Sequence, residues 1–159
     1  MAPDIGNLIA LDISIENERI TLINIYGPND DMPTFYDKIY DICDEFGNAT
    51  KIICGDFNLV QDPVLDTYQY KRLNNPKARE KILDIKEHLD LIDPFRELYP
   101  DKKRYTWRTN KPLKQARLDF FLMNDSYFNN VVDVEIDHGY RSDHSMIVLC
   151  CKMNDFVKG

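Results

Sequence analysis

A carboxylate and a carboxamide stand two residues apart at the end of a short apolar segment. Residues 51–55 are mostly apolar, and Asp56 and Asn58 follow them directly. Side chains at positions i and i+2 of an extended chain point to the same side, so a strand here presents both groups to one face. Polar groups at a strand end are typical of ligand sites in open α/β sheets. Taken alone, the same residues also fit a turn, because Gly, Asp and Asn are turn formers.

A second carboxylate, Asp119, lies inside the apolar segment 117–123, where it must face water or find a partner within the protein. His144 is the candidate partner, because a carboxylate fixes the tautomer of an imidazole and stabilises its charged form. Such a pair suits acid–base chemistry or neutralisation of a phosphate. A structural ion pair fits the residues equally well. Asp143, the neighbour of His144, adds a carboxylate of the kind that hard cations bind.

Positive charge is concentrated in one segment of an otherwise acidic chain. The chain has 27 acidic and 20 basic residues and a net charge of -7, which argues against general nucleic-acid binding. However, seven basic residues and no acidic one lie within residues 102–117, beside Tyr105 and Trp107. Aromatic rings next to cations suit stacking on bases and contact with phosphates. A solvated hairpin with scattered lysines is the alternative.

The overall composition predicts one soluble globular domain. A chain of 159 residues with 43% hydrophobic and 30% charged residues can form a single core, and this composition excludes disordered, collagen-like and membrane-spanning classes. The four cysteines form no CxxC motif, which favours reduced thiols in an intracellular protein. No secretory signal is visible, so the predicted location is nuclear or cytoplasmic, not secreted, and no membrane partner is expected.

The elements that must position these residues alternate between strands and helices, which predicts an α/β or α+β layered fold. Residues 7–15 and 19–26 are β-branched segments that predict a hairpin with its turn at Asn17. Further strands are expected at residues 51–55, 104–109, 118–123, 131–137 and 145–153.

Two helices are expected between these strands. The first begins at Pro33 and ends before Gly47. The second begins with Asn75 as N-cap and Pro76 at its first position. Its apolar face ends at the Asp93-Pro94 break and comprises Ile82, Ile85, Leu89 and Ile92.

Taken together, the motifs occur in an order that resembles the endonuclease/exonuclease/phosphatase superfamily. The resemblance is greatest to the endonuclease domain of LINE-type (non-LTR) retrotransposons and covers residues 6–153. It rests on Asn24-Ile-Tyr-Gly-Pro-Asn29, Gly55-Asp-Phe-Asn58, Tyr105-Thr-Trp107, Arg117-Leu-Asp119 and Ser142-Asp-His144. The resemblance implies a four-layered α/β sandwich of two mixed β-sheets flanked by helices. Residues 1–153 would form this domain, and residues 154–159 would begin a linker.

The implied activity is hydrolysis of phosphodiester or phosphomonoester bonds with a divalent cation, Mg²⁺ or alternatively Mn²⁺. The implied partners are DNA and a reverse transcriptase domain in the parent polyprotein. Asp56 would activate the attacking water, Asn58 would hold that water and the phosphate, and His144, oriented by Asp119, would contact the scissile phosphate. The remaining implied site residues are Tyr26 and Asn29 at the phosphate, Asp143 at the metal, Thr106 and Ser142 supporting the site or the DNA backbone, and Lys111, Lys114 and Arg117 at DNA.

The sequence departs from the family pattern in two places. The family's principal metal-binding Glu and an Asn lie on strands that precede residue 7, so we expect a truncated member with a weak metal site, an uncovered sheet edge and little activity alone. Abasic-site endonucleases carry Trp just before the Arg-Leu-Asp motif, where this chain has Ala116. This difference favours a retroelement-like nuclease. A superfamily enzyme acting on another phosphoester and an inactive retroelement-derived fragment are the alternatives.

Overall fold

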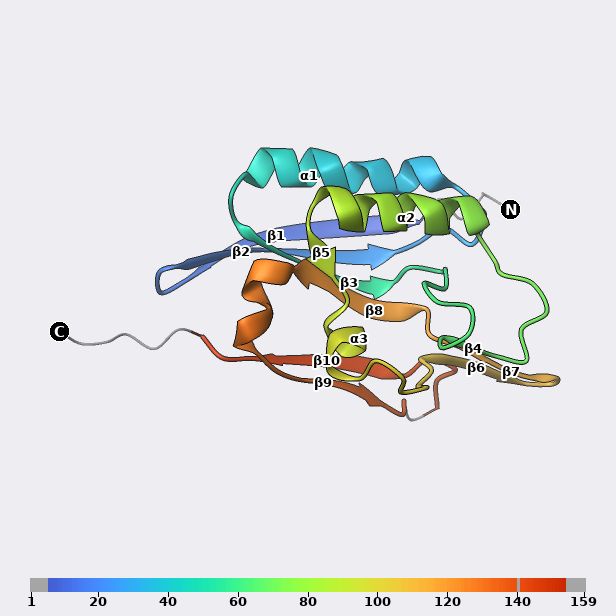
Figure 1. The fold of residues 1–159 in the computed structure, drawn as a ribbon. Helices are drawn as coiled ribbons and strands as arrows, with labels where there is room; N and C mark the ends of the chain where they lie inside the picture. The colour runs from blue at the N-terminus through green and yellow to red at the C-terminus, as the bar shows by residue number, and fades with distance from the viewer. Residues whose placement is uncertain (1–5, 140, 154–159) are drawn as a thin grey trace.

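The computed structural model describes residues 6–139 and 141–153 of the chain. Its centre is a five-stranded mixed sheet in which β2 and β3 run parallel and the other neighbours run antiparallel (Figure 1). In spatial order the strands are β1 (Asn7–Ile15), β2 (Glu18–Tyr26), β3 (Thr50–Asp56), β8 (Asp119–Asn124) and β5 (Leu91–Ile92).

The inner strands β3 and β8 are apolar on both faces because both faces of the sheet are covered. On β3, Ile53 belongs to the core beneath the helices, whereas Ile52 belongs to the core on the opposite face. On β8, Phe120 and Phe121 divide between the two cores in the same way. Continuous apolar runs of this kind are typical of strands buried on both sides.

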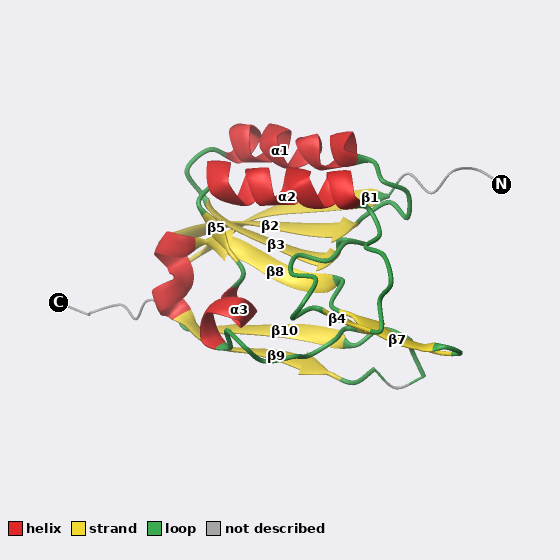
Figure 2. Cartoon of the chain, turned by 45° about the vertical axis from the view of Figure 1, so that its right-hand side comes forward, coloured by secondary structure: helices red, strands yellow, loops and turns green. Residues whose placement is uncertain are grey.

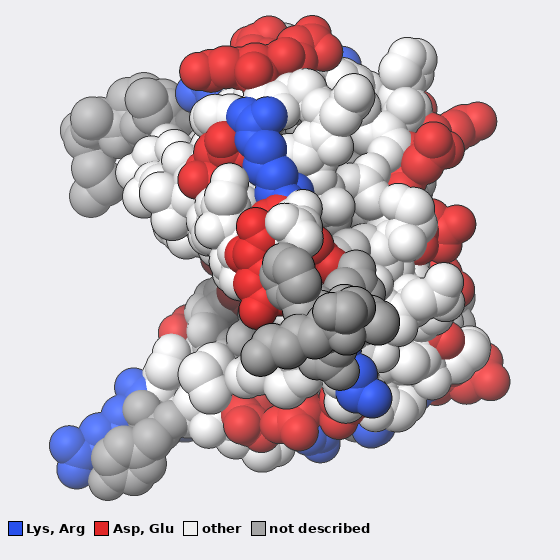
Figure 3. All heavy atoms as spheres, turned by 90° about the vertical axis from the view of Figure 1, so that its left-hand side faces the viewer, with Lys and Arg blue, Asp and Glu red and all other residues white. Residues whose placement is uncertain are grey.

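One face of the sheet is covered by helices. The 3-10 helix η1 (Pro33–Asp37) leads into α1 (Lys38–Phe46), and α2 (Pro76–His88) lies beside it (Figure 2). The predicted first helix is confirmed, although its first turn is 3-10 rather than α-helical. Acidic side chains gather along the outer surface of this helical layer, at the top of Figure 3.

The predicted side-chain cap of α2 is wrong. Asn75 occupies the N-cap position, but its backbone is left-handed, with φ of 49°, and its side chain makes no capping bond. Instead, the carboxylate of Asp31 accepts hydrogen bonds from the N–H groups of Lys77 and Ala78 at 3.1 and 2.8 Å. A carboxylate at a helix start satisfies the free N–H groups and the helix dipole, so the cap comes from a distant part of the chain.

The predicted apolar face of the second helix also extends too far. The helix ends at His88, and Ile92 lies in β5, paired with Met123 of β8. The reversal occurs at Asp90, whose φ is 50°. Asp93 caps α3 (Pro94–Leu98) by accepting from the N–H groups of Phe95 and Arg96, so the predicted break is the start of another short helix.

The opposite face of the sheet is covered by strands in two pieces. The first piece is the antiparallel pair β9 (Val131–Asp137) and β10 (Met146–Cys151), with α3 and the 3-10 helix η2 (Asp125–Asn130) beside it. The second is a three-stranded sheet of β4 (Thr67–Tyr68), β7 (Leu113–Ala116) and β6 (Trp107–Asn110). The two pieces meet at an isolated antiparallel bridge between Trp107 and His144.

The predicted α/β class, with sheets flanked by helices, is confirmed. In the described residues, Figures 1 and 2 show helices, the central sheet and the lower strands, without a helical layer outside β9 and β10. Among the described residues, β1 is an outer strand of the central sheet, and Ile9 and Leu11 on one of its faces are 58% and 54% exposed, whereas Leu8 and Ala10 on the other face pack against the core. The expectation that strands are missing beyond β1 stays a prediction. The predicted linker at residues 154–159 lies outside the described residues. Among the helices that the structure describes, none has the length and apolar character needed to cross a membrane.

Candidate active site

Three polar side chains form a row across the central sheet. Tyr26 ends β2 in parallel register with Asp56, and Asp56 ends β3 directly opposite Asp119, the first residue of β8. By the alternation of side chains along these strands, all three point to the face that is covered by β9 and β10. The sheet register therefore brings together residues that lie up to 93 positions apart in the sequence. Tyr26, at the rim of the row, is 46% exposed.

His144 reaches this row from the loop before β10. Its Nδ1 lies 2.8 Å from Oδ2 of Asp119, and its Nε2 lies 3.9 Å from Oδ2 of Asp56. Because Asp119 accepts the Nδ1 proton, the imidazole is oriented with Nε2 toward Asp56. Ser142 supports this loop through its hydroxyl oxygen, which accepts a hydrogen bond from the His144 N–H at 3.1 Å. The structure thus places the three predicted residues together.

The electrostatics of the cluster are those of partly buried acids beside one imidazole. Burial, reinforced by the neighbouring charge of Asp119, raises the pKa of Asp56 to about 6, against a stabilising hydrogen bond from the Asn58 N–H. The hydrogen bond to Asp119 raises the pKa of His144. At neutral pH, Asp56 is therefore a carboxylate of unusually high basicity, and the hydrogen bond to Asp119 shifts the equilibrium of His144 toward its protonated form.

The backbone after Asp56 is fixed by close contacts. Gly55 has φ of 127°, and a Cβ there would lie 2.1 Å from the Ile25 carbonyl oxygen, so only glycine fits. Asn58 also has a positive φ, and its Nδ2 donates to the Gly27 carbonyl at 2.6 Å. Asn75, whose side chain donates to the Asn58 carbonyl at 2.8 Å, supports this turn. The sequence suggested Asn75 only as a helix cap, and no local pattern signalled this role.

Thr106 is fully buried, so the prediction that it contacts the DNA backbone is wrong. Its hydroxyl oxygen accepts hydrogen bonds from the N–H groups of Leu118 and Asp119, each at 2.9 Å. The side chain thus holds the start of β8, where Asp119 enters the site. Its predicted role in supporting the site agrees with this geometry.

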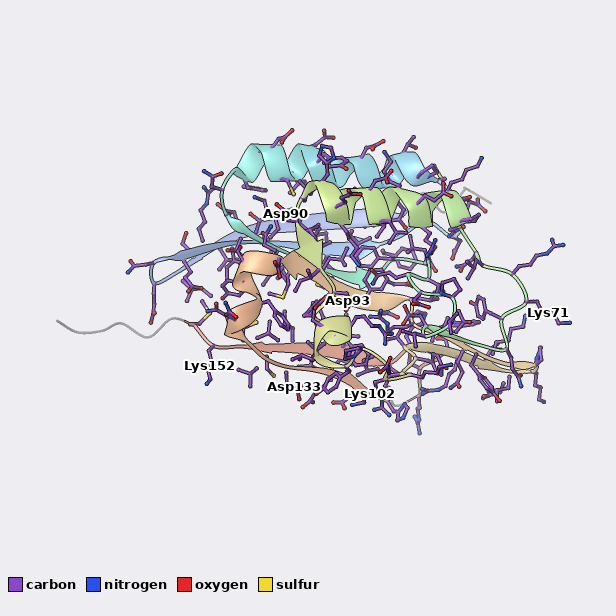
Figure 4. The ribbon with its side chains drawn as sticks, in the orientation of Figure 1. Lys71, Asp90, Asp93, Lys102, Asp133 and Lys152 are labelled. Carbon is purple, nitrogen blue, oxygen red and sulfur yellow. The ribbon has the colours of Figure 1, made fainter. Side chains whose placement is uncertain are left out.

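Arg117 is only 1% exposed, and the prediction that it contacts DNA is wrong. Its guanidinium binds the Asp66 carboxylate at 2.8 and 3.1 Å and approaches Asp93 at 2.6 Å. Figure 4 labels Asp93 where the chain passes from β5 to α3. Both acidic partners are remote in sequence, and a buried arginine requires such partners. Arg117 therefore stabilises the fold.

The basic segment is divided further by its contacts. Arg104 donates to the Ile136 carbonyl at 3.1 Å, and Arg108 donates toward the Ser145 hydroxyl at 3.4 Å. Lys111 is exposed at the end of the β6–β7 hairpin, and Lys114 is half-buried on β7. Only part of the predicted positive patch is therefore available to a ligand.

Within the described residues, Asp56, Asp119 and His144 are a group that could hold a metal ion, with ligand atoms within 4.8 Å of one another. The donor set fits a divalent cation, because Mg²⁺ is usually bound by one or two protein carboxylates and water. Asp143 and Asn29 are exposed, and Asp143 lies outside this group. The assignments of Asp143 to a metal and of Asn29 to a phosphate stay predictions.

Several known proteins resemble this chain in sequence or in structure. The chain is 30% identical over 173 residues to Recombination repair protein 1 of Drosophila melanogaster, which covers 92% of this chain and 24% of the relative. The endonuclease domain of TRAS1, a telomere-specific non-LTR retrotransposon, superposes with a TM-score of 0.74 at 16% identity, covering 94% of this chain and 65% of that one. The AP endonuclease LMAP from Leishmania major gives 0.72 at 21% identity, covering 91% and 54%.

These structural similarities establish the fold, and the chain spans less than two thirds of each of these relatives. The family model described as Endonuclease-reverse transcriptase matches residues 20–148, which include the candidate active site from Tyr26 to His144. Since this match extends over more than half of the sequence, the chain belongs to the Endonuclease-reverse transcriptase family.

Proposed function

We propose that this chain is a divalent-cation-dependent DNA endonuclease domain of a non-LTR retrotransposon, which nicks target DNA. The observation that carries the proposal is the contact series from Asp119 through His144 to Asp56, with distances of 2.8 and 3.9 Å. This series pairs an oriented imidazole with a carboxylate of raised pKa, and phosphodiester hydrolysis needs a proton acceptor and a group that stabilises negative charge.

In the proposed reaction each residue of the series has a separate task. Asp119 keeps the proton on Nδ1 of His144 and so orients the ring. Nε2 of the protonated imidazole faces the scissile phosphate and stabilises the charge that develops on it. Asp56, ionised at neutral pH and with a pKa of about 6, accepts the proton of the attacking water.

The divalent cation, Mg²⁺ or alternatively Mn²⁺, would be held by the carboxylates of Asp56 and Asp119. When bound, it supplies Lewis-acid activation of a phosphate oxygen. Tyr26 at the rim would contact the phosphate from the side of β2. The exposed Lys111 would contact the DNA backbone, and a reverse transcriptase domain in the parent polyprotein would be the partner that uses the nick.

A repair-type endonuclease is the second candidate, favoured by the 30% identity to the Drosophila repair protein and by the fold shared with AP endonucleases. Ala116, which is fully buried in a small core, argues against a pocket for a damaged sugar at that position. An oligonucleotide with one abasic site distinguishes the two. Preferential cleavage at that site favours the repair-type enzyme, whereas equal cleavage of intact DNA favours the retroelement-type enzyme.

Nicking of supercoiled plasmid by the 159-residue chain tests the proposal. We expect weak, cation-dependent nicking, in line with the expected weak metal site, that stops in EDTA and falls about 10²- to 10³-fold in His144→Ala, the range for loss of one group that stabilises transition-state charge. The matched control is His88→Ala, because His88 lies on α2 against Tyr40, outside the site. Absence of cation-dependent nicking, or equal nicking by both variants, would contradict the proposal.

A further inference from the structure

His144 is carried by the loop that connects β9 to β10, residues 138–145. Two contacts among the described residues fold this loop onto itself. The Ser142 hydroxyl accepts a hydrogen bond from the His144 N–H at 3.1 Å, and a Cβ on Gly139 would lie only 2.3 Å from the His144 carbonyl oxygen. These contacts shape the loop, but they do not attach it to the central sheet, which carries the two acidic partners of His144.

The start of β6 attaches one end of this loop to the site. Two backbone hydrogen bonds flank the isolated bridge between β6 and the loop. The Ser145 N–H donates to the Thr106 carbonyl at 2.6 Å, and the Arg108 N–H donates to the Asp143 carbonyl at 3.0 Å. The backbone thus fixes residues 143–145, whereas the beginning of the loop has no part in this pairing.

The guanidinium of Arg108 contacts both ends of the loop. Its Nη1 lies 3.2 Å from Nδ1 of His138 and 3.4 Å from the Ser145 hydroxyl oxygen. Its Nη2 lies 3.5 Å from the carbonyl oxygens of Gly139 and Ser142. Each of these contacts is long for a hydrogen bond. Their number is what restrains the loop, because all four are made by one rigid, planar group.

The charge of Arg108 is not what holds it there. Within the described ranges, its guanidinium forms no ion pair with a carboxylate, in contrast to Arg96 and Arg117, which both pair with Asp66. All the acceptors around the half-buried Arg108 side chain come from the loop and carry no carboxylate charge. Arginine has five donors in a fixed planar arrangement, whereas the ammonium of lysine is a compact charge on a flexible stem. The donor geometry of arginine therefore explains this arrangement.

We infer that Arg108 is a positioning residue of the proposed reaction. It holds the loop of residues 138–145 so that the His144 imidazole stays 2.8 Å from Asp119 with Nε2 toward Asp56. A displacement of about 1 Å at the reacting groups can cost about 10²-fold in rate, so restraint of this loop matters for catalysis. The inference rests on the proposed function and adds to it a residue that acts through His144.

The hydrogen bond between His144 and Asp119 gives a direct readout of this positioning. In the 159-residue chain labelled with ¹⁵N-histidine, NMR measures how fast the Nδ1 proton of His144 exchanges with water, and His144→Ala identifies its signal among the three histidines. Exchange requires local opening of the hydrogen bond. In EDTA and without DNA, Arg108→Lys, which keeps the charge but loses the planar group, should accelerate this exchange at least about tenfold.

Nicking kinetics give the second readout. Arg108→Lys should lower kcat by about 10²-fold and leave KM nearly unchanged, because a displaced His144 affects the chemical step rather than DNA binding. The matched control is Arg104→Lys, because Arg104 donates to the Ile136 carbonyl of β9 at 3.1 Å and not to the loop. His138→Ala, at an exposed position, removes one acceptor of Arg108 and should accelerate proton exchange by a smaller factor. Circular dichroism of each variant verifies folding.

Two results would overturn the inference. One is an unchanged exchange rate of the His144 proton in folded Arg108→Lys and His138→Ala. The other is a higher KM with unchanged kcat in Arg108→Lys, which would mean that Arg108 binds DNA instead. Because the exchange measurement involves neither DNA nor a cation, faster exchange in Arg108→Lys without nicking by the natural chain would reject only the proposed activity. Nicking by the natural chain with unchanged exchange in the variants would reject only the positioning role.

Discussion

Replacing Thr106 by Val tests the support of the active site by a buried hydroxyl. Val has almost the same shape as Thr but removes the oxygen that accepts from the N–H groups of Leu118 and Asp119 at 2.9 Å. A buried donor that loses its acceptor costs about 1–3 kcal/mol. Since the Asp119 N–H is only partly buried, we expect a total loss of about 2–4 kcal/mol in the free energy of unfolding.

The control is Thr106→Ser, which keeps the hydroxyl and removes only a buried methyl group, at a cost of about 1 kcal/mol. Urea denaturation of both variants, followed by circular dichroism, measures the difference. With a urea slope of about 2 kcal/mol per molar, the midpoint of Thr106→Val should fall by about 1–2 M. Since the same hydroxyl fixes the start of β8, Thr106→Val should also nick DNA more slowly than Thr106→Ser.

Equal stability of the Val and Ser variants would refute this reasoning. It would mean that water, or a shift of the backbone, satisfies both N–H groups without the threonine. If the Val variant is as stable as the natural chain but nicks DNA more slowly, the hydroxyl affects nicking without affecting stability. The assumed link between the stability loss and the slower nicking would then be wrong.

Three further predictions concern buried charge, ionisation and DNA contact. Arg117→Met should lower the free energy of unfolding by about 3–5 kcal/mol in urea denaturation, because two buried carboxylates lose their shared guanidinium: Asp66 keeps only the ion pair with Arg96, and Asp93 keeps only hydrogen bonds. Lys103→Met, at an exposed cation, should change it by less than about 1 kcal/mol, and equal losses would contradict the burial argument. In EDTA at pH 7, Asp56→Asn should have a larger free energy of unfolding than the natural chain, because the natural carboxyl, with a pKa of about 6 in the folded protein, is ionised there at a cost. Below about pH 4 this carboxyl is protonated in both the folded and the unfolded protein, so the difference should vanish. A stability difference that does not change with pH would contradict this prediction. Lys111→Ala should reduce the slope of log DNA affinity against log salt concentration by about one, the value for one phosphate contact. Binding titrations at several salt concentrations measure this slope, and an unchanged slope would show that Lys111 does not contact the DNA.

The sequence predicted the elements of the site well because strand periodicity and motif order are local signals. The apolar segments 51–55 and 118–123 predicted the strands that the structure shows as β3 and β8. Asp56 follows one of these segments and Asp119 lies inside the other. Each alone also fitted a turn or a structural ion pair, and only the order of the motifs predicted that both belong to one site. Their pairing in one register, which sets their separation, follows from the sheet and not from either segment alone.

The errors arose where a residue's partner is distant in sequence. Asn75 has the sequence of a helix cap, but Asp31 takes that role because the folded chain places its carboxylate at the helix start. Arg117 belongs to a basic segment by sequence and to a buried ion-pair network by structure. Ile92 continues the helical periodicity, yet pairing with β8 places it in a strand. Tertiary contacts decided each of these cases.

The central claim is that Asp119, His144 and Asp56 act as one catalytic unit. Its most direct test is a double-mutant cycle on plasmid nicking, with Asp119→Ala, His144→Ala and the double variant assayed at saturating cation, so that loss of Asp119 as a cation ligand does not limit nicking. If Asp119 acts through His144, the double variant should nick no more slowly than His144→Ala alone. Losses that multiply in the double variant, or nicking that persists in all three, would contradict the claim.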